Sequence, residues 1–93
     1  MEILNEIVDI DFEYEKILEW ATLHKGLKIW WEDRSWFFSW EYGFISFDGI
    51  KPKEEDKARK ATALFIYLWK NKNISASLAE RLAASYVLMY TIN

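Results

Sequence analysis

The chain has 93 residues, of which 52% are hydrophobic and 18% aromatic, and its formal net charge is −3. This length fits one domain, and this composition is too apolar for a disordered chain. The chain contains no cysteine, which excludes disulfides and thiolate metal sites. It opens on an acidic stretch unlike a signal peptide, and its longest nearly uncharged stretch, residues 82–92, is too short to span a membrane. We therefore expect one soluble, cytoplasmic domain.

The first twenty residues are strongly acidic. Seven acidic residues and one lysine give them a charge of −6, so residues 21–93 carry +3. Such a surface repels phosphate and favours a basic partner, unless it is only a solvated helix face. The acids predicted to contact a partner are Asp9, Asp11, Glu13, Glu15 and Glu19.

The first helix is predicted over residues 11–25, with Asp11 as its cap and Gly26 at its left-handed stop. An apolar stripe at helical spacing runs along it: Tyr14, Ile17, Leu18 and Ala21. The residues before Asp9 fit either a helix or a strand, and their spacing favours a helix.

An aromatic stretch follows, over residues 27–47. Two-residue turns at Asp33-Arg34 and Tyr42-Gly43 predict a three-stranded meander, in which Trp31 pairs with Trp36 and Trp40 with Ile45. The predicted core face consists of Leu27, Ile29, Trp31, Trp36, Phe38, Trp40, Ile45 and Phe47. On the opposite face lie Trp30, Phe37 and Phe44, which we predict to bind a partner. We predict that Trp30 and Phe37 are partly exposed neighbours. If a helix covers that face, these rings are ordinary core.

Two further helices are predicted, over residues 52–70 and 77–90. Pro52 suits a first helical position, and Ser77 with Glu80 fits a capping box. The resulting order α-β-β-β-α-α defines an α+β fold, in which helices cover one face of the sheet.

The C-terminal helix is depleted of charge, since Glu80 and Arg81 are the only charged residues after residue 73. A helix that is apolar on every side must be buried on every side. We therefore predict a homodimer, unless this helix is central within a monomer. The predicted contact residues are Ala79, Ala83, Tyr86, Val87 and Tyr90.

No pattern of catalytic chemistry is found. His24 is the only histidine, and the glycines are isolated, so neither a metal site nor a phosphate-binding loop is indicated. We expect a non-enzymatic protein without a cofactor.

Two hypotheses for the function remain. The first is a protein-binding module whose partner is basic or handles nucleic acid. By topology alone the chain resembles some phage-encoded anti-CRISPR inhibitors, which implies an acidic inhibitor from a mobile element that occupies a basic groove. The alternative is nucleic-acid binding. Residues 11–69, with Lys57, Arg59 and Lys60 at a helix start, are similar to the double-stranded RNA-binding domain, although the first hairpin turn is shorter and the chain is acidic.

Overall fold

The computed structural model describes the backbone of residues 14–40 and 43–92, with side chains as far as residue 86. In chain order the elements are α2 (Tyr14–Lys25), β1 (Lys28–Glu32), β2 (Ser35–Trp40), β3 (Gly43–Phe47), α3 (Glu55–Asn71) and α4 (Ala76–Ile92). The predicted α-β-β-β-α-α order and the α+β class are confirmed.

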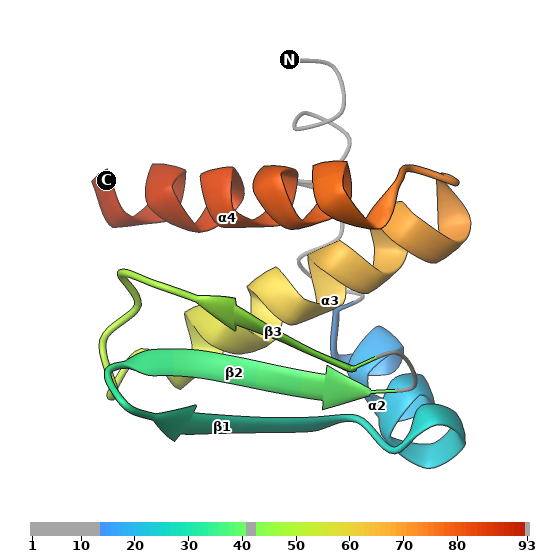
Figure 1. Ribbon diagram of the computed structural model, residues 1–93, viewed down its shortest axis with the longest axis horizontal. Coiled ribbons are helices and arrows are strands. Elements are labelled where there is room, and N and C mark those ends of the chain that lie inside the picture. The colour runs from blue at the N-terminus through green and yellow to red at the C-terminus, as the bar shows by residue number, and fades with distance from the viewer. Residues whose placement is uncertain (1–13, 41–42, 93) are drawn as a thin grey trace.

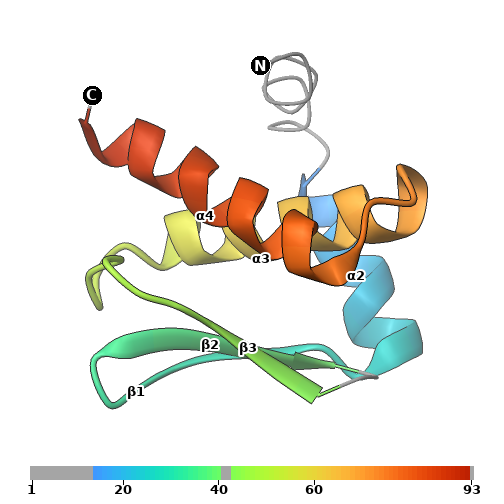
Figure 2. The ribbon, with the colours of Figure 1, turned by 45° about the horizontal axis from the view of Figure 1, so that its top comes forward.

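The three strands form one antiparallel sheet in the order β1-β2-β3. The helices lie on one side of this sheet, and α4 crosses α3 (Figures 1 and 2). Within the described part of the chain, no element covers the other side of the sheet. We call the side toward the helices the inner face and the opposite side the outer face.

The first hairpin has the predicted register. Trp31 pairs with Trp36 and Trp30 with Phe37, around a turn in which Asp33 and Arg34 have φ values of 48° and 68°. Positive φ at both central residues defines the type I′ turn, whose twist matches that of the flanking strands.

The second hairpin differs from the prediction by two residues. Phe38 pairs with Ile45 and Trp40 with Gly43, so Gly43 begins β3 and is not part of the turn. Its partner in the predicted turn, Tyr42, lies outside the described residues. Because side chains alternate with a period of two, a shift of two residues changes the pairing and keeps every side chain on its predicted face.

The stop of α2 is confirmed. Gly26 has φ 66°, and the Leu27 amide donates to the Ala21 carbonyl across the reversal at 3.2 Å. A left-handed glycine is the common way to end a helix, because it has no Cβ to crowd the carbonyl. The predicted cap, Asp11, lies outside the described residues.

The starts of α3 and α4 differ from the predictions. Pro52 lies in the turn before α3, which begins at Glu55. Helix α4 begins at Ala76, and the hydroxyl of Ser75 accepts the Leu78 amide at 3.3 Å. A capping hydroxyl belongs to the residue before the helix, so Ser77, inside the first turn, does not form the predicted capping box.

The core lies between the inner face and the helices. Its largest side chains include Phe38 of β2 and Phe65 of α3, each 1% exposed, with ring centroids 5.4 Å apart. Helix α3 is the central helix, buried nearly all round, whereas the monomeric alternative placed α4 there. Its buried residues are Ala58, Ala61, Thr62, Ala63, Leu64, Phe65, Ile66 and Leu68.

Candidate binding surface on the outer face of the sheet

The three aromatic residues predicted on the outer face lie side by side, one from each strand. The ring centroids of Trp30 and Phe37 are 5.7 Å apart with an interplanar angle of 16°, and those of Phe37 and Phe44 are 6.0 Å apart at 58°. We call Trp30, Phe37 and Phe44 the outer strip. The register places them in line, since Trp30 pairs directly with Phe37 and Phe44 pairs with Ser39, the next residue of β2 on the outer face.

The outer strip is open to solvent. Trp30 and Phe37 are half-buried, and 70% of Phe44 is exposed. The prediction that Trp30 and Phe37 are partly exposed neighbours is therefore confirmed. Trp30 and Phe37 lie nearly parallel and shield each other, whereas the ring of Phe44 is tilted by 58° to that of Phe37 and is the most exposed of the three.

The polar groups around the strip have both signs of charge. Lys28 and Glu32 lie at the two ends of β1 and are exposed. The indole nitrogen of Trp30 donates to a carboxylate oxygen of Glu32 at 2.9 Å. This bond fixes the orientation of the indole and leaves its ring face available for contact.

One residue assigned to the core face is exposed. Trp31 points inward but lies on the edge strand β1 and remains 37% exposed. It packs edge-on against Trp36, with the two ring centroids 5.9 Å apart. Sequence alternation assigns the face of a residue, but it does not indicate how far the helices extend over the edge of the sheet.

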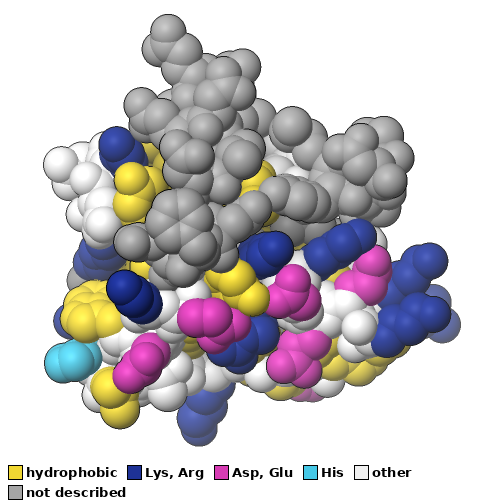
Figure 3. Space-filling view, turned by 180° about the vertical axis from the view of Figure 1, so that it is seen from behind, with side chains coloured by type: hydrophobic (Ala, Val, Ile, Leu, Met, Phe, Trp, Pro, Cys, Tyr) yellow, Lys and Arg dark blue, Asp and Glu magenta, His cyan; other side chains and the backbone are white. Residues whose placement is uncertain are grey.

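The predicted acidic surface is only partly described. Glu15 and Glu19 are exposed on α2, while Asp9, Asp11 and Glu13 lie outside the described residues. Glu15 is paired with Arg59 of α3 at 3.0 Å. Seen from behind, Lys and Arg side chains alternate with Asp and Glu side chains over the described surface (Figure 3). Negative charge on this part of the surface is therefore partly neutralised.

Basic residues at the start of α3 are also paired. Lys57 contacts Glu54 at 2.8 Å, Arg59 contacts Glu15, and Lys60 lies 3.6 Å from Asp56. These three residues carry the resemblance to the double-stranded RNA-binding domain. Because each has a carboxylate partner, a phosphate would have to compete with an ion pair already formed.

A further contact joins α2 to α3. The Tyr14 hydroxyl donates to a carboxylate oxygen of Asp56 at 2.6 Å, and this hydrogen bond raises the pKa of Tyr14 above its ordinary value. The phenolate form would be repelled by this carboxylate, so the contact favours the neutral phenol.

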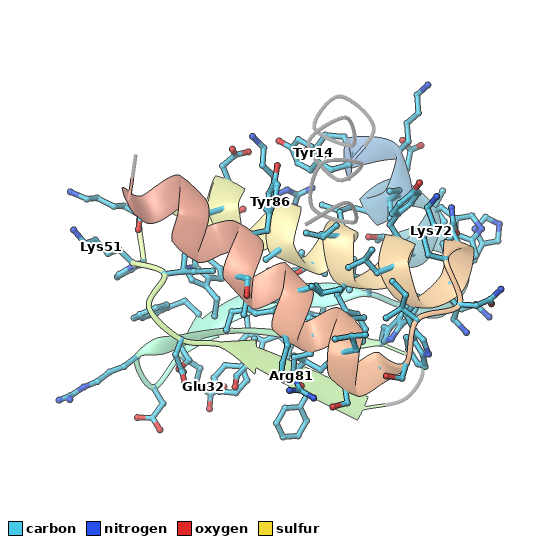
Figure 4. The ribbon with its side chains drawn as sticks, turned by 90° about the horizontal axis from the view of Figure 1, so that it is seen from above. Tyr14, Glu32, Lys51, Lys72, Arg81 and Tyr86 are labelled. Carbon is cyan, nitrogen blue, oxygen red and sulfur yellow. The ribbon has the colours of Figure 1, made fainter. Side chains whose placement is uncertain are left out.

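The self-association residues on α4 are placed differently from the prediction. Ala79, Ala83 and Tyr86 are at most 3% exposed and belong to the core of the chain itself. Figure 4 shows α4 lying diagonally over α3, with Arg81 and Tyr86 on opposite sides of it. The side chains of Val87 and Tyr90 lie outside those described. The small residues thus allow α4 to approach its own core closely, and dimerisation through α4 stays untested.

One groove was not anticipated from the sequence. It lies between α2 and α3, has a volume of about 240 Å³, and is lined in part by Lys16, Trp20 and Tyr67. Trp20 is 42% exposed, and its ring stacks on that of His24 with centroids 5.9 Å apart. One feature of the sequence could have indicated this groove: Trp20 is a large apolar residue that lies outside the apolar stripe of α2.

Within residues 14–40 and 43–92, no three His, Cys, Asp or Glu side chains come together as metal ligands would. In the same part of the chain, none of the helices combines the length and the apolar character needed to cross a membrane. Comparisons with protein-family models, with curated proteins and with solved structures found no match.

Proposed function

We propose that the protein is a non-enzymatic protein-binding module, and that its partner contacts the outer strip. The observation that carries this proposal is the row of three contacting aromatic rings on a sheet face that no described element covers. Aromatic side chains are enriched among the residues that dominate binding energy, since they bury a large area with little loss of conformational entropy.

Charge supports a protein partner over a nucleic acid. The outer face combines Lys28 with Glu32, and the chain is acidic overall. Non-specific nucleic-acid affinity comes chiefly from neutralising phosphates with Lys and Arg, and the basic residues at the start of α3 are already paired. A role as an acidic inhibitor that occupies a basic groove, in the cytoplasm, is a narrower form of the same proposal. It depends on acids that are partly neutralised or outside the described residues.

Site-specific cross-linking tests the proposal. A photoreactive phenylalanine analogue at position 44 would be irradiated in extract of the source cells, and cross-linked proteins identified by mass spectrometry. The matched control carries the same analogue at position 20, an exposed aromatic position on α2. We expect one protein to be captured at position 44 and not at position 20. The capture should be lost when Phe37→Ser is added.

Equal capture at both positions, or at neither, would contradict the assignment of the outer strip. Fluorescence titration with mixed single-stranded and double-stranded oligonucleotides tests the alternative function, nucleic-acid binding. Quenching of tryptophan fluorescence that disappears at high salt, and is lost in Phe37→Ser, would indicate nucleic-acid binding instead.

A further inference from the structure

The two edges of the sheet differ in how they are protected. Strand β1 has Lys28 and Glu32 at its ends, and charged side chains on an edge strand discourage pairing with other chains. Strand β3, with the sequence GFISF, contains no charged residue. Its Phe44 is 70% exposed and its Ser46 is exposed. By composition, β3 is therefore the unprotected edge.

The backbone groups that β3 directs outward follow from the register. In antiparallel strands, successive residues direct their N–H and C=O alternately to the two sides. The two-residue turn makes Glu32 and Ser35 a hydrogen-bonded pair, so Ser35, Phe37 and Ser39 bond to β1. The intervening residues of β2 then bond to Gly43, Ile45 and Phe47.

It follows that Phe44 and Ser46 direct their N–H and C=O groups to the open side of β3. No backbone hydrogen bond from another described segment reaches these groups. The inner side of the same edge is also open. An apolar cavity of about 140 Å³ lies there, lined in part by Trp40, Ile45 and Trp69.

We propose that β3 pairs antiparallel with β3 of a second copy of the chain, about a two-fold axis at Ile45. This register places Phe44 opposite Ser46 of the second copy, and Ser46 opposite its Phe44. Those are the residues whose backbone groups point outward, so four N–H···O=C bonds form and none of the groups is left over. A large ring faces a small hydroxyl on the outer face, and Ile45 faces its equivalent on the inner face.

The second copy is favoured as the occupant because β3 is complementary to itself. The pairing brings no charged side chains of the two β3 strands together, because GFISF has none. It also joins the two outer strips on one six-stranded sheet, with the exposed ring of Phe44 in each copy near the axis. Dimerisation does not depend on the proposed partner, since the edge groups lie on the backbone and not on the outer strip.

Proline at position 46 tests this pairing selectively. Ser46→Pro removes an outward N–H while keeping the extended backbone, and edge strands tolerate proline where the N–H faces solvent. Ser46→Ala is the matched control, since it removes the hydroxyl and keeps the N–H. Sedimentation velocity from micromolar to millimolar protein would be measured for each, with circular dichroism to confirm folding.

We expect the wild type and Ser46→Ala to form dimers, and Ser46→Pro to dimerise more weakly by a factor of about 30 or more, since each dimer loses two hydrogen bonds. If Ser46→Pro does not fold, Ser46→Lys places two like charges near the axis and should have the same effect. A wild type that stays monomeric over the whole range would overturn the proposal, and so would a Ser46→Pro dimer of unchanged strength. A cross-link from position 44 to a second copy gives a product of twice the chain mass that contains only this chain, whereas the proposed partner is a different protein in the mass spectrum. Loss of the first product with retention of the second, or the reverse, lets the two proposals fail separately.

Discussion

The two faces of the sheet are made by the same three strands and carry similar side chains, yet they have different surroundings. On the inner face, Phe38 is 1% exposed. Its ring stacks on that of Phe47, with centroids 5.6 Å apart, and also contacts the ring of Phe65 of α3. On the outer face, the rings that Phe37 contacts within the described residues are those of Trp30 and Phe44 on the two neighbouring strands, and Phe44 remains 70% exposed. Aromatic content alone therefore does not separate core from surface in this chain.

The difference comes from the helices. Among the residues that the structure describes, only the inner face has a helix against it, and aromatic rings meet side chains from a second layer only there. The indole of Trp36 also donates to the Lys51 carbonyl at 2.9 Å, which holds the segment before α3 against the sheet. Within the described part of the chain the outer rings contact one another and no second layer, which leaves them available to a second molecule.

The largest effect that separates the faces is expected from Phe38→Ala. Truncating this buried ring removes its contacts with Phe47 and Phe65 and leaves a cavity, so the free energy of unfolding should fall by about 3–5 kcal/mol. Urea denaturation followed by circular dichroism measures the change. If the variant is unfolded in buffer, Phe38→Leu should remain folded and lose less than Phe38→Ala, because leucine keeps most of the buried apolar volume. A loss below 1 kcal/mol for Phe38→Ala would contradict its place in the core.

Much of the sheet was predictable from the sequence because both of its strongest signals are local. The turn at Asp33-Arg34 sets the first register, and alternation of side chains assigns the faces. The second register was not predictable in the same way. Pairing Trp40 with Gly43 or with Ile45 preserves the faces equally well, so hydrophobic patterning does not distinguish them.

The environments of the candidate residues depend on tertiary contacts. Sequence indicated that Ala79 and Ala83 allow close helix approach, but both are buried in the core of the same chain, where α4 packs against α3. It likewise identified Glu15 as acidic without revealing Arg59 beside it, because the two residues are 44 positions apart. The outer strip could be predicted because its members are placed by the strands alone.

A smaller, stabilising effect is expected at the Asp33-Arg34 turn, which fixes the register of the first hairpin. Arg34 has φ 68°, a left-handed conformation that glycine adopts without steric cost. Arg34→Gly should raise the free energy of unfolding by about 1 kcal/mol, because side-chain strain at positive φ outweighs the extra entropy of glycine in the unfolded chain. Urea denaturation measures it. Arg34→Ala, which removes the charge and keeps the Cβ, is the control and should show no such gain.

On the outer face, Phe37→Ala should lower the free energy of unfolding by less than about 2 kcal/mol, because each of its two cross-strand ring contacts contributes roughly 0.2–1 kcal/mol. The same variant should lose most of the cross-linking at position 44, because Phe37 is the central ring of the outer strip. Thermal unfolding and the cross-linking yield are measured on one preparation. A loss of stability comparable with that of Phe38→Ala would mean that the outer strip is structural, and the contrast between the faces would disappear.

The smallest effect concerns Glu54, just before the helix that covers the inner face. One carboxylate oxygen of Glu54 accepts the Lys51 amide at 3.0 Å, and the other lies 2.8 Å from the Lys57 ammonium. The Lys57 contact, followed by the Lys51 amide, lowers the pKa of Glu54 from its ordinary 4.5. A lowered folded pKa gives stability that is present above the unfolded value and is lost as the pH falls through the folded one.

Glu54→Gln should therefore lower the urea midpoint slightly at pH 7, and the difference from wild type should vanish at a pH well below 4.5. The change stays small because Glu54 and Lys57 are both partly open to solvent, which screens their ion pair. Glu55→Gln, one residue further along the exposed first turn, removes a charge from the same helix end without touching either contact of Glu54. An equal, equally pH-dependent loss in both variants would assign the effect to the helix dipole and not to the Glu54 contacts, because a dipole acts on any carboxylate in the first turn.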